Sequence, residues 1–173
     1  MNSKIKYPRP SFTHDLLYPV TILFLYLSFH GYADSDRSII QPQTSELITL
    51  EQEIFSLINA HRSSANLPFL IMNPALVEEA RHHSRAMSLS LTPFGHEGLK
   101  QRKKNISRLL PGNTIAENVA WANSSTRVAE KIVKGWLKSG RHRKNIEGCY
   151  QTTGIGAAKN FKGIYYITEI FWK

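Results

Sequence analysis

The spacing of apolar residues changes along this chain from a helical period to a strand period, and that order limits the fold class more than any other feature. Apolar side chains recur every three or four residues over residues 49–63, 73–87 and 126–139, which predicts three amphipathic helices. The end of the chain instead holds two strand-like runs, at 154–157 and 165–171, joined by a turn as in an antiparallel hairpin. This order predicts an α+β fold with helices packed on an antiparallel sheet.

Local signals suggest where the predicted helices begin and end. Thr49 followed by Gln52 fits a capping box at the start of the first helix. Asn73 before Pro74 is typical of the first residues of a helix and predicts the start of the second. Gly140 is expected to end the third helix.

The N-terminal residues have the pattern of an export signal. Residues 1–15 carry three basic residues and one acidic residue, and a largely apolar, uncharged run follows over 16–29. This run is too short for a comfortable membrane span, and Pro19 interrupts it, which favours a cleaved secretory signal ending at Ala33. The alternatives are an uncleaved signal-anchor that tethers the protein to a membrane, or a buried helix of the domain.

The length of 173 residues predicts one domain once this signal is set aside. Residues 34–48 are mostly polar and are expected to form a linker, so the domain spans 49–173. The only cysteine, Cys149, excludes an intramolecular disulfide and any CxxC site. We expect its thiol to be buried.

The positive charge is concentrated in one part of the sequence. The chain has a net charge of +9, and removing residues 1–33 leaves +7. Residues 100–144 hold twelve basic residues and two acidic ones, a net +10, and include most of a predicted basic loop over 95–113. This region predicts binding to an anionic cell-surface polymer or to anionic lipid, and the alternative is a solvated face that maintains solubility. No nucleic-acid partner is expected, because no groove-reading motif is present.

Several short sequences occur in the order found in a known family. They are Leu57 to Arg62, Ala80 to Ser84 with Met87, Phe94 to Gly98, Ala116 to Ala120, Gly135-Trp136 with Ser139, His142-Arg143 with Asn145-Ile146, Thr153 to Gly156, and Tyr166 to Phe171. Over residues 49–173 the chain resembles the CAP superfamily, which comprises SCP-like, cysteine-rich secretory, antigen 5 and pathogenesis-related 1 proteins, and most of all its disulfide-free, bacterial single-domain branch. The resemblance implies a three-layer α-β-α sandwich around a small antiparallel sheet.

The resemblance also implies a cleft with a defined set of side chains. It places pocket residues at His96, Glu117 and His142, with Asn118 beside them and Ala116 in place of the usual glycine. Two further cleft positions depart from the pathogenesis-related 1 pattern, since Ser139 replaces a glutamate and Tyr166 replaces a histidine. Glu169, also assigned to the cleft, stands where a glutamine is usual.

These cleft residues permit more than one chemistry. His96, His142 and Glu117 could bind zinc or another divalent cation with one open coordination position. In a metal-assisted hydrolase, the two histidines would instead be the metal ligands and Glu117 the base. Without metal, Glu117 could instead orient a histidine through one ring nitrogen. Purely structural roles also stay open: Glu117 could cap a helix or bind buried backbone amides, and His142 could follow a helix C-terminus and interact with its dipole.

Other motifs argue against an enzyme. His96-Glu97 does not extend to HExxH, and no GxSxG sequence accompanies the serines. Of the remaining histidines, His83 is expected to be buried and hydrogen-bonded, His82 exposed, and His61 a C-terminal helix cap.

The expected protein is therefore a secreted or periplasmic CAP-domain binding or effector module, and a monomer. Its His/Glu cleft would take a small ligand, a peptide, a lipid or a divalent metal ion. The two alternatives are the hydrolase and a surface-interaction protein that acts through residues 100–144.

Overall fold

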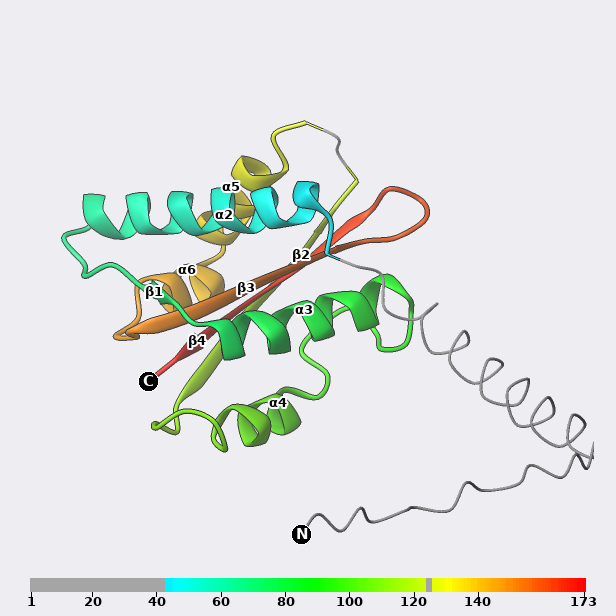
Figure 1. Ribbon diagram of the computed structural model, residues 1–173. Coiled ribbons are helices and arrows are strands. Elements are labelled where there is room, and N and C mark those ends of the chain that lie inside the picture. The colour runs from blue at the N-terminus through cyan, green and yellow to red at the C-terminus, as the bar shows by residue number, and fades with distance from the viewer. Residues whose placement is uncertain (1–42, 124–125) are drawn as a thin grey trace, which may run out of the picture. The chain divides into compact units, whose positions relative to one another are not determined.

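A computed structural model describes residues 43–123 and 126–173, and residues 43–173 form one compact unit (Figure 1). The predicted signal segment, residues 1–33, and most of the predicted linker lie outside the described residues. In the part that is described, no helix combines the length and the apolar character that a membrane span requires.

In the described chain, two of the strands lie between helices, so the order is not helices first and strands last. In order, they are α2 (Ser45–Ser64), β1 (Ile71–Met72), α3 (Pro74–Ser88), α4 (Leu99–Ile106), β2 (Ile115–Ala122), α5 (Val128–Lys138), α6 (Gly140–Ile146), β3 (Thr152–Lys159) and β4 (Tyr165–Trp172).

The four strands form one mixed sheet in the order β1-β3-β4-β2. β3 and β4 pair as the predicted antiparallel hairpin, β2 pairs antiparallel with the other side of β4, and β1 pairs in parallel with β3. Helices α2, α5 and α6 cover one face of the sheet, and α3 and α4 cover the other (Figure 1). The α+β class and the three-layer α-β-α arrangement are thus confirmed, with a mixed sheet in place of a purely antiparallel one.

Each face of the sheet has its own apolar core. The larger core joins α2 and α5 to alternate residues of β3 and β4, and its fully buried members include Ile54, Ile58, Ile155, Ile167 and Phe171. A smaller core lies under α3 and α4 and consists of Leu76, Ala80, Ile106, Ile170 and Trp172. Alternation along β4 explains this division, because successive side chains of a strand point to opposite faces.

Two glycines of β3 allow α3 to lie directly on the sheet. A Cβ atom at Gly156 would lie 2.1 Å from the backbone nitrogen of Arg81, and one at Gly154 would lie 2.2 Å from the backbone carbonyl carbon of Leu76. Both distances are far below van der Waals contact, so a side chain at either position would push the backbone of α3 away from the sheet.

We therefore expect Gly156→Ala to destabilise the fold by about 1–3 kcal/mol or more, the usual cost of overpacking. Gly135→Ala is the matched control, because a Cβ atom at this exposed position of α5 meets nothing within 4 Å. The control should be neutral or more stable by up to about 1 kcal/mol, since alanine is the better helix former. Urea unfolding of both variants measures the difference, and equal stabilities would contradict the close approach of α3.

The predicted start of the second helix is confirmed and that of the first is wrong. The side chain of Asn73 accepts from the backbone N–H of Ala75 at 2.9 Å, as expected of an N-cap. α2 instead begins at Ser45, where Thr44 is the N-cap, so Thr49 lies inside the helix and residues 45–48 of the predicted linker are helical. The apolar period of this helix is as predicted, but a residue pair that fits a capping box can also occur within a helix.

Three further expectations are corrected. The predicted loop 95–113 contains α4, and Gly140 begins α6 instead of ending α5, because the extended backbone of Ser139 separates the two helices. Cys149 is exposed, not buried, because it lies in the surface turn between α6 and β3.

Candidate functional site

Strand β2 is an edge strand of the sheet and carries the two polar residues at the centre of the candidate site. Successive side chains of a strand point to opposite faces. Glu117 accordingly faces α4, where it contacts Arg102, and Asn118 faces α6, where its amide donates to the backbone carbonyl of His142 at 3.2 Å. The interpretation of Glu117 as a helix cap is therefore wrong, since it lies within a strand.

Glu117 is held by an arginine that the sequence analysis did not identify. Its side chain is 0% exposed, and both of its carboxylate oxygens accept from Arg102: Nε donates to Oε2 at 2.7 Å and Nη2 donates to Oε1 at 2.8 Å. Arg102 Nη1 also donates to the backbone carbonyl of Glu97 at 2.8 Å. This two-pronged contact fixes the position of the carboxylate, as is typical of arginine–carboxylate pairs.

His96 connects the buried carboxylate to solvent. Its Nδ1 lies 2.9 Å from Glu117 Oε1, and its side chain is 47% exposed. Because an ionised carboxylate only accepts hydrogen bonds, Nδ1 carries the proton. In the neutral ring, Nε2 is then left with a lone pair.

His83 holds the loop that carries His96. As predicted, it is buried and hydrogen-bonded: its Nε2 donates to the backbone carbonyl of Gly95 at 2.8 Å. Burial lowers the pKa of His83, and the positive charge of Arg102 acts in the same direction. His83 is therefore neutral at pH 7 and positions the residue before His96. His82, on the same helix, is exposed as predicted.

α6 brings His142 to the edge of β2. Asn145 donates from Nδ2 to Asn118 Oδ1 at 2.9 Å and to the backbone carbonyl of Glu117 at 3.3 Å, which attaches α6 to the strand. Burial lowers the pKa of His142, and the nearby charges of His96 and Arg141 lower it further. His142 lies in the first turn of α6, so the suggested role at a helix C-terminus is wrong.

Among the described residues, Ser139 and Tyr166 form no hydrogen bond with His96 or Glu117. Ser139 lies at the junction of α5 and α6, where its backbone carbonyl accepts from the N–H of Arg143 at 2.8 Å. Tyr166 pairs with Trp121, four residues along β2 from Glu117, a separation of about 13 Å at the usual rise of a strand.

Glu169 lies on the other face of the sheet. It pairs with Asn118 across the strands and points to the α6 side, away from Glu117. Its Oε1 lies 3.4 Å from Thr153 Oγ1, and within the described residues its buried Oε2 has no hydrogen-bond partner. Burial raises the pKa of Glu169 to about 8, so the carboxyl group is mostly protonated at pH 7.

The His96, Glu117 and His142 side chains do not fit the predicted metal site. Across the described ranges, no group of three or more His, Cys, Asp or Glu side chains is arranged to hold a metal ion. The reason is local: Arg102 engages both oxygens of Glu117 and His96 shares one of them. The same contacts leave Glu117 poorly placed to act as a general base.

Arg102 and Asn145 are side chains of the candidate site that the sequence analysis did not assign to it. Arg102 is one of several cations in residues 100–104, and its burial follows only from its helical phase with Ile106, which is four residues later and also buried. Asn145 was part of a recognised motif, but its role depends on the packing of α6 against β2.

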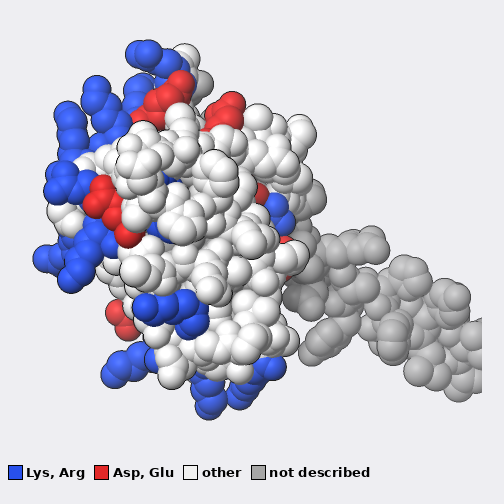
Figure 2. Space-filling model, turned by 90° about the vertical axis from the view of Figure 1, so that its left-hand side faces the viewer, with Lys and Arg blue, Asp and Glu red and all other residues white. Residues whose placement is uncertain are grey.

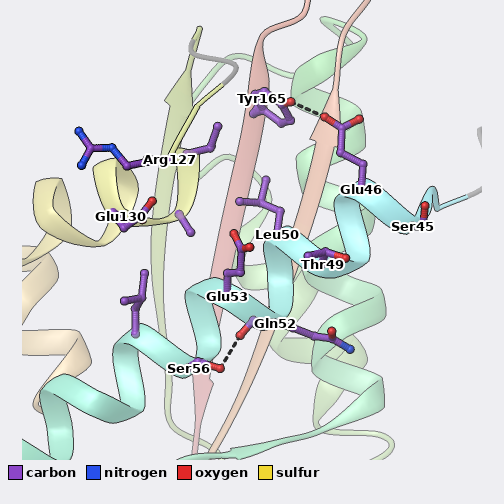
Figure 3. A pocket seen from close by; sticks show the side chains of 13 residues that line it. Ser45, Glu46, Thr49, Leu50, Gln52, Glu53, Ser56, Arg127, Glu130 and Tyr165 are labelled. Carbon is purple, nitrogen blue, oxygen red and sulfur yellow. Dashed lines mark hydrogen bonds between the residues drawn. The ribbon is translucent and has the colours of Figure 1, made fainter.

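A cavity lies elsewhere, between α2 and the start of α5 (Figure 3). It has a volume of about 880 Å³ and is lined mainly by polar side chains, among them three carboxylates and one cation, namely Glu46, Glu53, Glu130 and Arg127. Tyr165 donates its hydroxyl to Glu46 at one end of this cavity.

Comparisons with known proteins identify the family. The model of the CAP family, the cysteine-rich secretory protein family, matches residues 55–172. A search of the curated proteins gives no match.

Solved structures agree with this assignment. An outer surface protein of Borrelia burgdorferi is 19% identical, with a TM-score of 0.60 over 72% of this chain and 92% of its own. An extracellular SCP-domain protein of Bacillus anthracis is 29% identical, with a TM-score of 0.59 over 78% of this chain and 45% of its own. A cysteine-rich secretory protein of Staphylococcus aureus is 18% identical, with a TM-score of 0.61 over 75% of this chain and 40% of its own. The chain spans less than half of these last two proteins. By its sequence match and its fold, this chain belongs to the CAP family.

Proposed function

We propose that this protein is an extracellular CAP-domain binding module whose ligand contacts His96 at the edge of β2. One observation carries the proposal: a half-exposed imidazole is bonded at 2.9 Å to a fully buried carboxylate, which an arginine holds on both oxygens. Burying this charged pair is costly for a domain of this size, and buried groups that hold a solvent-facing histidine in one orientation are typical of binding and active sites.

The chemistry of His96 indicates what such a ligand would present. With Nδ1 bonded to Glu117, the neutral ring offers Nε2 as a hydrogen-bond acceptor, which suits a hydroxyl or amide N–H of a small molecule or peptide. His142 would contribute a second neutral imidazole, because burial and neighbouring charges lower its pKa. A metal-assisted hydrolase is less well supported, since both oxygens of Glu117 are already engaged.

An extracellular location is part of the proposal. Two structural neighbours support it by their descriptions, an outer surface protein and an extracellular protein. The basic and then apolar pattern of residues 1–29 supports export independently.

Imidazole NMR tests the proposal. In nitrogen-15 spectra at pH 8 we expect the His96 ring to be protonated on Nδ1 alone. In a screen of small hydroxyl compounds, amides and short peptides, we expect ligands to shift the resonances of His96 and His142. His96→Ala should abolish this binding, a loss of at least tenfold in affinity.

His82→Ala is the matched control, because His82 is also an exposed histidine and lies on α3. This variant should bind as the wild type does. Equal binding by both variants, or a His96 ring protonated on Nε2 alone, would contradict the proposed role of His96.

A further inference from the structure

A second, positively charged surface lies on α5, α6 and the C-terminus. Figure 2 shows Lys and Arg side chains gathered along the left edge of one face, and others along its lower edge, the end of the molecule at which Figure 1 shows α4. We name as the α5–α6 basic surface six of the exposed cations of these elements, which are Lys131, Lys134, Lys138, Arg143, Lys144 and Lys173.

On α5, the cations form a line because the other side of the helix is buried in the core. Val128, Ile132, Val133 and Trp136 face the sheet. At 100° per residue, Lys131, Lys134 and Lys138 fall within an arc of about 60° and extend over about 10 Å along the helix. Successive charges are therefore neighbours, as side chains three and four residues apart are on any helix.

At the end of this line the surface is hollowed. A cavity of about 380 Å³ is lined by Arg143, Lys144 and Lys173 together with the turn that contains Gly148. Its one acidic lining residue, Glu147, is bonded to His61, whose Nε2 lies 2.9 Å from Oε1.

A buried cation adds to the positive field of the hollow. Arg62 is 1% exposed, and its guanidinium donates to the backbone carbonyls of Pro68, Ile146 and Gly148 at 2.6–3.0 Å. The guanidinium thus lies against the turn at Gly148, and among the described residues it forms no ion pair. Within residues 126–173, Lys134, Lys138, Arg143 and Lys144 form no ion pair either.

We propose that the α5–α6 basic surface binds a linear polyanion, with a phosphate or sulfate group in the hollow and the following groups along α5. Three of the six cations line the hollow and the other three lie on α5, and five of the six are lysines. A lysine ammonium acts as a point charge, whereas an arginine guanidinium can donate two parallel hydrogen bonds to one group. A surface made mostly of lysines therefore favours a ligand whose charges are suitably spaced over the specific recognition of one chemical group.

A membrane surface fits this face less well than a polymer does. Interfacial helices insert exposed apolar side chains between lipids. The exposed large apolar residues of the described chain are Ile48, Phe69, Ile71, Leu89, Leu91, Phe94, Leu109, Trp121 and Phe161, and none of them lies on α5 or α6.

Binding of the full chain to heparin and to long-chain inorganic polyphosphate tests the proposal. If four to six of the cations contact the polymer, the logarithm of the affinity should fall with the logarithm of the salt concentration with a slope of about −3 to −5. Affinity should then decrease roughly a hundredfold or more between 50 and 200 mM NaCl, and pyrophosphate, which cannot span the surface, should bind far more weakly.

Charge reversal identifies the surface. We expect Arg143→Glu/Lys144→Glu and Lys134→Glu/Lys138→Glu each to reduce affinity at least tenfold and to make the salt slope shallower by about 2. The matched control is Lys103→Glu/Lys104→Glu, which changes the net charge equally at two exposed lysines of α4, in the other helical layer.

Equal losses in all three variants would overturn the proposal, because they would show a response to net charge alone. Binding to vesicles of phosphatidylcholine and phosphatidylglycerol (3:1) but to neither polymer would overturn it in favour of a lipid surface. Circular dichroism melting of each variant verifies folding, and a variant that does not fold is replaced by the corresponding glutamine pair. His96 is unchanged throughout, so failure here leaves the proposed function unaffected.

Discussion

Replacing Arg102 with alanine is expected to destabilise the protein by about 3–5 kcal/mol, the range measured when one partner of a buried ion pair is removed. The side chain of Glu117 would stay buried, with His96 as its remaining side-chain partner. α4 would also lose its attachment, since Arg102 joins this helix both to β2 and to the backbone of Glu97. Urea unfolding at pH 7 measures the loss.

A double-mutant cycle separates the ion pair from general packing. Arg102→Ala/Glu117→Gln removes the buried charge that the single variant leaves uncompensated, so it should recover part of the stability, with a coupling energy of at least about 1 kcal/mol. Arg108→Ala, at an exposed arginine just beyond α4, should change stability by less than about 0.5 kcal/mol. A coupling energy near zero would mean that the pair does not hold this site together.

If Arg102→Ala is too unstable to purify, Arg102→Lys provides the same test. Lysine keeps the positive charge but cannot donate to both carboxylate oxygens at once, so an intermediate loss of stability is expected. Full wild-type stability in this variant would show that charge alone, and not the two-pronged geometry, positions Glu117.

The sequence predicted the parts of the fold in which one face is apolar and the other polar. Helices α2, α3 and α5 and the hairpin of β3 and β4 satisfy that condition, and the predicted range of each lies close to the range in the structure. β2 was missed because its centre, Glu117 and Asn118, is polar and yet buried on both faces. From sequence alone, two consecutive polar residues favour a loop, because the partners that bury Glu117 and Asn118 lie on α4 and α6, far away in the sequence.

The candidate site was predictable only through the family resemblance. His96 and Glu117 are 21 residues apart and bond across a loop and a sheet edge, a contact that no local spacing implies. The resemblance did not distinguish the two faces of the sheet, so it grouped Glu169 with Glu117 although the alternation of neighbouring strands sends them to opposite helical layers. Which of the predicted cleft residues contact one another therefore depends on the face of the sheet to which each side chain points.

Glu169 should make the protein less stable as the pH rises, and Glu169→Gln should remove that loss. Burial raises the pKa of this carboxyl group to about 8 in the folded protein, whereas its ordinary value is 4.5. Between these two values the unfolded chain has released the proton and the folded chain retains it. The free energy of unfolding therefore decreases with pH across this window, by a total on the order of 5 kcal/mol, and levels off above pH 8.

Glutamine has nearly the same shape as the protonated glutamate and does not titrate, so Glu169→Gln should match the wild type near pH 4.5 and exceed it by a few kcal/mol at pH 8.5. His83 and His142 do not confuse the comparison: burial lowers the pKa of each, so their stabilising contribution is lost only as the pH falls below about 6.5, and both variants share it. The matched control Glu53→Gln alters an exposed carboxylate of α2 and should give no difference from the wild type at either pH.

Urea unfolding across pH 4.5–8.5 measures the free energy of unfolding of all three proteins. A constant difference between wild type and Glu169→Gln at every pH would mean that Glu169 is ionised in the fold, in which case the charge of Arg62 outweighs burial.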